Sequence, residues 1–396
     1  MRTAGVVVIW TAMSTRTHIS PQRVNEFTHQ LFSPVLHAKR VASIADATVG
    51  VLRGVSLSIH AIGAGLATAK GLTSKHATKQ VDRLLSNPGF ELDQLFSLWV
   101  PFVLALRTEV VVAMDWTDFD DDDHTTLSLS VLTNHGRSTP LLWRTVRKSD
   151  LKKRRNLTED LLLHRLRKLV PQTVRITIVA DRGFGDQKLY AYLRELNMDY
   201  IIRFRQDILV TDSKGVRQKA REFVPTNHRA RRLTGAGVTA EQYPVGAVVL
   251  IHDHNMKDSW CLATSRTDLT SRQVIDLYGK RFSCEETFRD AKNAHLGLGL
   301  SQTHIHDALR RDRLLMVCAL AMALLTLLGA AGEAVGEDRK LKVNTVKTRT
   351  HSLFRQGCYY FQAIENWAPE RSAALLVRFS QLLSEHSWCR AAFGIV

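Results

Sequence analysis

Cysteine is scarce in this chain and never occurs as a close pair. The five cysteines are scattered over 396 residues, and none belongs to a Cys-x-x-Cys motif. This spacing argues against a disulfide framework and against structural zinc, and it favours a reducing compartment. Two His-x-His pairs, His252 with His254 and His304 with His306, have no matching second half. We therefore expect no metal role for these histidines.

Acidic residues are also under-represented. The chain has 38 Asp and Glu against 54 Lys and Arg, a formal net charge of +16. Such an excess implies a polyanionic partner, and nucleic acid is favoured over a membrane surface because basic residues recur along the whole chain. The apolar content of 45% excludes a disordered chain, and the length allows two or three domains.

Long apolar runs are rare, and two of them need an explanation. Residues 314–331 are long enough to cross a membrane, but frequent alanine and the presence of Thr326 and Gly329 favour a buried core helix. Residues 1–12 are apolar but short, and no clear cleavage site follows them. We expect residues 1–19 to be disordered or an upstream extension, with Met13 as the true start, and we expect no membrane partner.

The most informative pattern lies in residues 278–292, YGKRFSCEETFRDAK. No proline interrupts it and strong helix formers fill its end, so we expect a helix throughout. At about 100° per residue, one arc of roughly 60° holds Tyr278, Arg281, Glu285 and Lys292. Arg289 lies close to this arc, and Phe282 and Phe288 are expected to anchor the helix on a core. The face offers a carboxylate, cations and a phenol; the alternative is a solvated face with ordinary ion pairs.

The spacing of these four residues resembles a known signature. Tyr, two residues, Arg, three residues, Glu, six residues and Lys is similar to the YREK motif of cut-and-paste DDE transposases of bacterial insertion sequences, in the insertion-sequence-four family. The segment CEETFRDAKNAHLGLGL resembles sequences of its composite-transposon branch. The resemblance to the family extends over about residues 70–335. The resemblance implies that Glu285 is the third metal-binding carboxylate of an RNase H-like site, with two aspartates upstream at strand ends.

Two aspartates fit this expectation. Asp115 interrupts an apolar β-branched strand at residues 109–119, where an unpaired carboxylate costs several kcal/mol unless it binds a cation. Asp181 ends a strand at 174–181 and opens the glycine turn RGFG, a usual ligand position in α/β sheets. By resemblance, these are the first and second catalytic aspartates. We expect the acidic run at 118–123 to be a solvated turn and Asp186 to cap the next helix.

Residues 20–105 are predicted to form a helical DNA-binding domain. Within it, one helix ends near Gly71 and a second begins at Thr73 or Ser74 and stops before Asn87, which is the pattern of a helix-turn-helix. The second helix carries a basic stripe that we predict contacts DNA, made of Lys75, Lys79 and Arg83. An ordinary amphipathic helix with solvated lysines is the alternative. The resembling family also has a helical N-terminal domain that binds the ends of its element.

Residues 106–335 are predicted to form an α/β catalytic domain with an RNase H-like core, a mixed sheet flanked by helices. Residues 126–132 and 140–146 read as a hairpin after the first strand, and the basic block 144–155 predicts phosphate contacts or a solvated loop. A short β-rich insertion is expected at about 206–264. By resemblance, Trp260 stacks on a flipped base at the DNA end, although a core Trp is equally compatible with the sequence. Residues 336–396 are predicted to be helical and, by resemblance, to contribute to dimerisation.

The resemblance implies a bacterial cytoplasmic DNA transposase, associated with the nucleoid when it is bound to DNA. It implies two Mg²⁺ ions, with Mn²⁺ able to substitute, held by Asp115, Asp181 and Glu285. It also implies that a homodimer cleaves terminal inverted repeats through a hairpin and joins the 3′ ends to target DNA. Hard cations prefer oxygen ligands, and two of them can activate water and stabilise the leaving oxygen. The alternatives are an inactive or domesticated sequence-specific DNA-binding protein and a plain RNase H-like nuclease.

Overall fold

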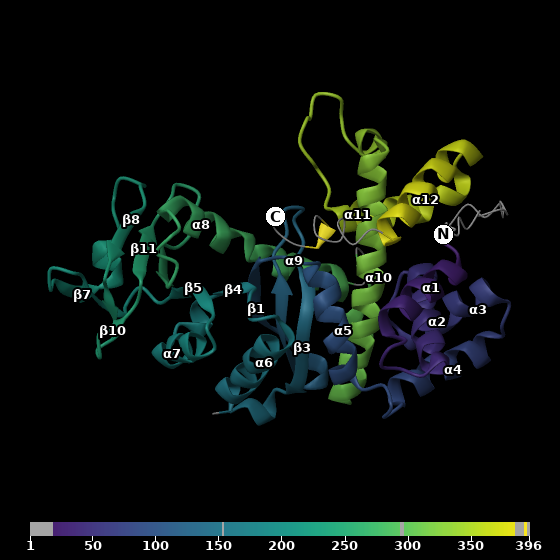
Figure 1. The fold of residues 1–396 in the computed structure, drawn as a ribbon, viewed down its shortest axis with the longest axis horizontal. Helices are drawn as coiled ribbons and strands as arrows, with labels where there is room; N and C mark the ends of the chain where they lie inside the picture. The colour runs from purple at the N-terminus through teal and green to yellow at the C-terminus, as the bar shows by residue number, and fades with distance from the viewer. Residues whose placement is uncertain (1–18, 153, 294–296, 385–391, 394–396) are drawn as a thin grey trace, which may run out of the picture.

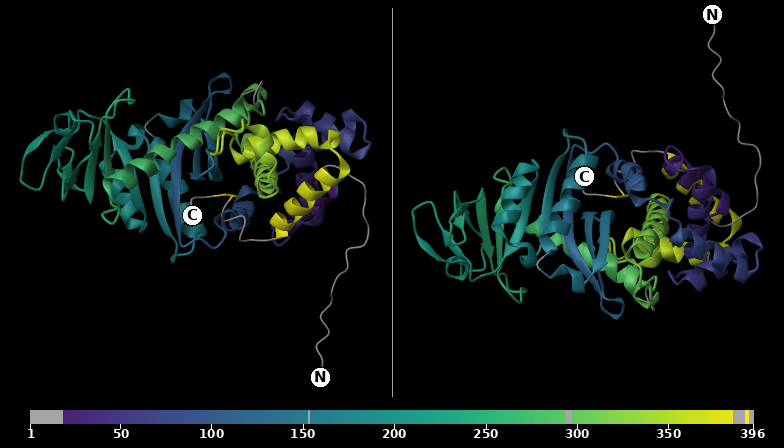
Figure 2. Two further views of the ribbon diagram at one scale, coloured as in Figure 1. Left: turned by 90° about the horizontal axis from the view of Figure 1, so that it is seen from above. Right: turned by 90° about the horizontal axis from the view of Figure 1, so that it is seen from below.

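The computed structural model describes residues 19–152, 154–293, 297–384 and 392–393. The predicted extension at residues 1–19, including Met13, lies outside these ranges except for Ile19. A mixed β-sheet forms the middle of the molecule, the N-terminal helices lie at one end and a β-rich segment lies at the other (Figure 1). Views from above and below show the same division (Figure 2).

Five helices precede the sheet. They are α1 (Pro21–Phe32), α2 (Ala38–Gly54), α3 (Ile59–Lys70), α4 (Ser74–Ser86) and α5 (Leu92–Leu104). The predicted helix-turn-helix boundaries are confirmed in α3 and α4. Gly71 ends α3 in the left-handed conformation at φ 68°, which glycine adopts without strain. The side chain of Thr73 caps α4 by accepting a hydrogen bond from the His76 backbone at 3.3 Å.

The main sheet has eight strands in the order β3-β2-β1-β4-β5-β12-β11-β8. The first five are β1 (Glu109–Phe119), β2 (His124–Val131), β3 (Thr139–Arg147), β4 (Arg175–Ala180) and β5 (Asp199–Phe204). Strands β1 to β3 form an antiparallel meander, whereas β4 runs parallel to both β1 and β5. This mixed α/β sheet flanked by helices confirms the predicted fold class and is consistent with an RNase H-like core.

The predicted insertion divides between two sheets. Four short strands, β10-β9-β6-β7, form a separate small sheet; they are β6 (Leu209–Thr211), β7 (Arg217–Lys219), β9 (Gly237–Val238) and β10 (Tyr243–Pro244). The other three extend the main sheet; they are β8 (Arg231–Thr234), β11 (Ala247–Ile251) and β12 (Trp260–Thr264). All five residues of β11 are buried, and such continuous apolar runs belong inside a covered sheet. The insertion is therefore only partly a subdomain of its own.

Helices cover both faces of the sheet. Along β1, Val111 and Ala113 point into a core built with α8 (Ser271–Lys280) and α9 (Phe282–Lys292). The alternating residues Val110, Val112 and Met114 join the larger core on the other face, together with α5, α6 (Arg155–Leu169) and α7 (Gln187–Glu195). Because side chains alternate along a strand, Asp115 belongs to the face beneath α8 and α9.

The apolar run 314–331 lies in a long helix, α10 (Ala308–Ala334), that is 94% buried over its most apolar window. It packs on α11 (Leu353–Ala363) so closely that a Cβ added at Gly329 would lie 1.9 Å from the Leu353 carbonyl oxygen. The last described helix is α12 (Pro369–Ser384). Helix α10 is long and apolar enough to span a membrane. It is buried in the protein, as expected for the core helix predicted from the sequence. The C-terminal region is helical, as predicted.

The N-terminal helices are attached to the catalytic region through α10. Arg310 binds the Asp82 carboxylate of α4 at 2.7 Å, and Arg313 donates to the Leu85 carbonyl at 2.8 Å and to the Phe90 carbonyl at 3.1 Å. The contact with Leu85 satisfies one carbonyl of the last turn of α4, where carbonyls have no partner within the helix. The orientation of α4 is therefore fixed relative to the sheet.

A buried carboxylate in α10 makes the stability of this fold dependent on pH. Asp312 is 5% exposed and accepts hydrogen bonds from the Thr145 backbone on β3 at 3.0 and 3.2 Å. Burial raises its pKa from 3.8 to about 7. Because the pKa of Asp312 is higher in the folded than in the unfolded protein, binding of its proton stabilises the fold. This stabilisation is complete below pH 3.8 and is lost as pH rises through 7.

We expect Asp312→Asn to remove this dependence, because the neutral amide can still accept from Thr145. The free energy of unfolding of the variant minus that of the unmutated protein should increase by about 2 kcal/mol from pH 5 to pH 8. Urea unfolding at the two pH values measures this difference. A constant difference between the two proteins would contradict a raised pKa at Asp312.

Candidate active site

The pairing of β1 with β4 brings two aspartates to the same level of the sheet. The last paired residues are Met114 and Ala180, so the residues that follow them, Asp115 and Asp181, are neighbours across the point where β4 ends. Asp181 accepts a hydrogen bond from the Gly183 backbone at 2.8 Å and so closes the predicted glycine turn. Asp181 directly follows β4, as the sequence predicted, whereas Asp115 lies inside β1, which continues to Phe119.

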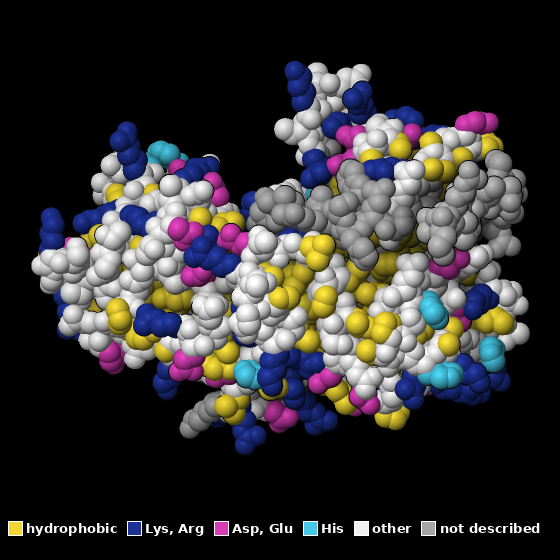
Figure 3. Space-filling view, in the orientation of Figure 1, with side chains coloured by type: hydrophobic (Ala, Val, Ile, Leu, Met, Phe, Trp, Pro, Cys, Tyr) yellow, Lys and Arg dark blue, Asp and Glu magenta, His cyan; other side chains and the backbone are white. Residues whose placement is uncertain are grey.

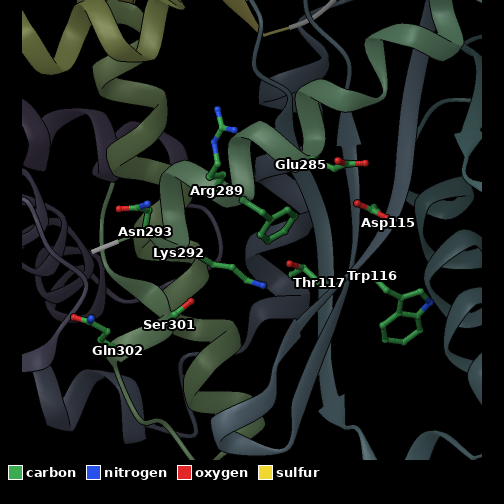
Figure 4. Close-up of a pocket in the computed structure, with 10 residues that line it drawn as sticks. Asp115, Trp116, Thr117, Glu285, Arg289, Lys292, Asn293, Ser301 and Gln302 are labelled. Carbon is green, nitrogen blue, oxygen red and sulfur yellow. The ribbon is translucent and has the colours of Figure 1, made fainter. Parts of the chain in front are cut away.

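Glu285 approaches from the helix above. Its carboxylate and that of Asp115 point toward each other across the gap between α9 and β1 (Figure 4). Arg281 lies between them, with Nη2 at 2.7 Å from Glu285 Oε1 and Nη1 at 3.9 Å from Asp115 Oδ2. The Arg281 side chain is only 6% exposed, so its charge is little screened by water.

The protonation of Asp115 reflects this crowding. Burial, with a smaller contribution from the nearby carboxylates of Asp181 and Glu285, raises its pKa from 3.8 to about 6 against the opposing effect of Arg281. A carboxyl group shifted by burial and by like charges in a cleft is a candidate functional group. The three carboxylates therefore act on one another electrostatically.

The helix that carries the YREK residues is broken, which corrects the continuous helix expected from the sequence. Helix α8 ends at Lys280 and α9 starts at Phe282, with Arg281 as the junction. The Arg281 backbone N–H donates to the Tyr278 carbonyl at 3.0 Å, three residues back, so the regular hydrogen-bond ladder is interrupted here. Gly279 lowers helix propensity at the same place. A single helical wheel therefore does not describe both halves.

Tyr278 is the residue most affected by this break. It is 1% exposed and packs edge-on against Trp260, with 4.7 Å between the ring centroids. Burial raises the pKa of its phenol. Its ring therefore packs against Trp260 and Arg281, and it is not exposed on a face beside Glu285.

Lys292 and Arg289 line the same cleft but point differently. Lys292 reaches toward Thr117, whereas Arg289 points away from the carboxylates (Figure 4). The Lys292 ammonium donates to the Asp118 carbonyl at 2.5 Å and lies 4.5 Å from the centroid of the Phe119 ring. Arg289 is exposed and pairs with Glu286.

Two aromatic residues near the site were not predicted in their actual roles. Phe282, expected to anchor the helix, is 43% exposed and lies 6.2 Å from Trp260 between ring centroids; Phe288 is the anchor, at 7% exposure. Phe282 is exposed because it starts α9 after the break.

Trp116 lies on the opposite face of β1, where its indole donates to buried Glu159 at 2.8 Å and faces the guanidinium of Arg155. Its position next to Asp115 in the sequence could have identified Trp116 as a residue near the site.

The acidic run 118–123 is not simply a solvated turn. Asp118 and Asp120 pair with Lys148 at the surface, in agreement with that prediction. Asp122, however, is buried and bound to Arg311 of α10, which is itself 0% exposed. The prediction was wrong for this residue because tertiary contact with α10 provides an ionic partner. Asp186 caps α7 as predicted, by accepting from the Lys188 backbone at 3.0 Å.

Asp115 and Glu285 open onto a cleft of about 700 Å³, which Asp181 does not line. Its lining residues include Asp115, Glu285, Arg289, Lys292, Ser301 and Gln302. Within the described part of the chain, no group of three or more His, Cys, Asp or Glu side chains stands close enough together to hold one metal ion. The predicted stripe on α4 is exposed and borders no part of this cleft.

A sequence profile described as the transposase DDE domain matches residues 107–322. The chain belongs to this family. The match runs from the start of β1 into α10, so this transposase has all three carboxylates inside the matched domain, with the N-terminal helices and most of the C-terminal region outside it. A search of curated proteins found no match to the chain. Family membership implies a nuclease or transposase that acts on DNA, and enzymes of this family generally use divalent metal ions.

We expect the Asp181→Asn substitution to lower the pKa of Asp115, because it removes a negative charge that disfavours ionisation of Asp115. Carbon-13 NMR titration of aspartate carboxyl groups in metal-free buffer measures this shift. Asp186→Asn is the matched control, since Asp186 caps α7 outside the carboxylate group. Equal Asp115 titrations in the two variants would show that the charge of Asp181 does not reach Asp115.

Proposed function

We propose that this protein is a cut-and-paste DNA transposase of the insertion-sequence-four type. The observation that carries the proposal is the proximity of Asp181 and Glu285 to Asp115 at the point where β4 ends, with buried Arg281 between Asp115 and Glu285. The family match supplies the reaction class, and the YREK spacing supplies the subgroup.

The residues present suit a site for two Mg²⁺ ions, for which Mn²⁺ can substitute. Asp115 is partly buried beside like charges, so a bound cation would relieve both its desolvation and its repulsion from Asp181 and Glu285. All three offer oxygen ligands, which hard cations prefer. Since no three such side chains among the described residues could hold one ion together, each ion would be held by only some of the three carboxylates. When bound, such a pair of ions supplies an activated water and stabilises the leaving oxygen.

The cations of the site have separate positioning roles in this proposal. Arg281 orients Glu285 through the 2.7 Å contact and can turn its planar fork to a phosphate. Lys292, fixed by the Asp118 carbonyl and Phe119, presents its ammonium to the strand in the cleft. Arg289 contacts DNA at the rim. Tyr278 acts mainly by supporting Arg281 and Trp260, since its hydroxyl is buried.

The proposed reaction needs no covalent protein–DNA intermediate. Water cleaves one strand, the released 3′-hydroxyl attacks the opposite strand to form a hairpin, and the hairpin is reopened before the 3′ ends join target DNA. Trp260 and exposed Phe282 offer ring faces beside Arg281 on which an unpaired base can stack. We propose that a homodimer carries out these steps, each subunit cutting the end bound by the other.

The helical domain would bind the terminal inverted repeats. Lys75, Lys79 and Arg83 are exposed on α4, the second helix of the helix-turn-helix, and basic side chains on such a helix can contact the DNA backbone. We place the protein in the bacterial cytoplasm, on the nucleoid when bound, without a membrane partner. The alternative function is an inactive or domesticated DNA-binding protein, which the complete set of carboxylates disfavours.

We expect Glu285→Gln to retain DNA binding and abolish cleavage, because the amide is a poor cation ligand and cannot carry the negative charge. The substrate is DNA that flanks the gene, incubated with Mg²⁺ and analysed on a denaturing gel for a nick followed by a hairpin. Glu286→Gln is the matched control: the residue is adjacent, and its carboxylate binds Arg289 and Arg137 outside the carboxylate group. Cleavage by Glu285→Gln at the rate of the control would refute the assignment.

We expect Lys292→Ala to slow strand cleavage by about 100-fold, the usual cost of losing one preorganised charge at a reacting phosphate, with little change in binding to uncut DNA. Lys280→Ala is the control, because Lys280 donates to the Asn134 side chain and borders no part of the cleft. Single-turnover cleavage and an equilibrium binding assay separate the two effects. Parallel losses of binding and cleavage would assign Lys292 to general DNA affinity.

A further inference from the structure

A second cleft lies on the N-terminal domain, between α2 and α4. It has a volume of about 260 Å³ and is lined by Arg40, Ser43, His76, Gln80, Arg83, Leu84 and Asn87. Its lining contains two arginines and four other side chains that can form hydrogen bonds, and it contains no carboxylate. Lys, Arg and His side chains gather over α4 at the lower right of the molecular surface (Figure 3). The cleft therefore suits an anionic ligand.

Both arginines of this cleft are available to a ligand. Within the described ranges, neither Arg40 nor Arg83 has an ion pair or a side-chain hydrogen bond. Other arginines that contact the N-terminal helices are engaged: Arg53, at the other end of α2, binds Glu365, and Arg310 binds Asp82, next to Arg83 in the sequence. Asp82 is thereby occupied by Arg310 and does not neutralise the cleft. Two unpaired guanidiniums facing one small cleft repel each other, and an anion between them removes that repulsion.

The turn after α4 is shaped to accommodate Arg40. The Asn87 side chain accepts a hydrogen bond from the Gly89 backbone at 2.9 Å, which closes the turn. A Cβ added at Gly89 would lie 2.5 Å from Cζ of Arg40 and 2.5 Å from Nη2. The guanidinium therefore lies directly against the Gly89 backbone. Only the absence of a side chain at this position permits that placement.

We propose that this cleft binds a phosphate group of the DNA backbone, held jointly by Arg40 and Arg83. The planar guanidinium presents donors that match phosphate oxygens, and Asn87 and His76 can add neutral donors at the rim. The inference rests on the proposed function for its partner, DNA. It extends that function by assigning Arg40 and the α2 side of the domain to DNA binding, in addition to the α4 stripe.

The location of the cleft gives this phosphate contact a positioning role. Helix α4 is held on α10 by Arg310 and Arg313, so the cleft has a fixed place relative to the catalytic sheet. A phosphate bound there sets how far the duplex extends before it reaches Asp115. Contacts to the backbone fix register without reading sequence.

The test uses the full-length chain carrying Glu285→Gln, so that binding is measured without cleavage. A fluorescent duplex of arbitrary sequence is titrated at several salt concentrations, because phosphate contacts are sequence-independent. We expect Arg40→Gln to weaken binding by about tenfold and to reduce the slope of log affinity against log salt by about 0.9, the value for one phosphate. Lys39→Gln is the matched control, with the same charge change on an adjacent exposed residue that does not line the cleft.

A further variant tests whether one phosphate is shared. The effects of Arg40→Gln and Arg83→Gln should be less than additive, because each removes part of the same contact. Circular dichroism and thermal unfolding verify that each variant is folded.

The outcomes separate this inference from the proposed function. Equal losses for Arg40→Gln and Lys39→Gln, or fully additive losses for Arg40→Gln and Arg83→Gln, would overturn the phosphate site even if the unmutated protein cleaves DNA. The expected pattern in a protein that shows no cleavage would support the phosphate site and argue against the transposase activity.

Discussion

The active site depends on one mismatch in strand length. Strand β4 ends at Ala180 while its parallel neighbour β1 continues to Phe119, and their register stops at Met114 and Ala180. Asp115 is consequently paired on its β2 side and open on its β4 side, where the turn led by Asp181 begins. Had β4 extended further, its backbone would cover this flank. The location of the cleft thus follows from backbone hydrogen bonding before any side chain is considered.

The second constraint is electrostatic. Three carboxylates act on one another here, and burial raises the pKa of Asp115 to about 6. Charges of one sign in a poorly solvated place are costly unless countercharge is provided. Arg281 provides part of it, and it can do so because the break between α8 and α9 turns it inward while leaving Glu285 exposed at the cleft. The break between α8 and α9, which the helical-wheel prediction missed, therefore helps to position the carboxylates.

Sequence patterns predicted the local features of this protein better than its long-range contacts. The α3–α4 boundaries, the strand positions of Asp115 and Asp181 and the core position of α10 follow from glycine turns, caps and apolar runs. The break at Arg281 was missed because the residues around it have no proline and fit a helical period. Asp122 was assigned to solvent because its partner, Arg311, lies 189 positions away. The extension of the sheet by β12, β11 and β8 was likewise invisible, since strand order depends on pairing between distant segments.

Helix α10 connects the two ends of the proposed DNA path. Arg310 and Arg313 bind α4 and the turn after it, while Arg311 is buried against Asp122 and lies 4.1 Å from the Phe119 ring centroid. The same ring lies 4.5 Å from the ammonium of Lys292. Arg310, Arg311 and Arg313, within four consecutive positions of one helix, thus contact both the N-terminal helices and the ring that lies beside Lys292. Breaking a buried ion pair is costly because it leaves one charge unpaired, so this connection resists independent movement of the two sites. In the proposed function, helix α10 would therefore set the orientation in which DNA held on α2 and α4 reaches the cleft beside Asp115.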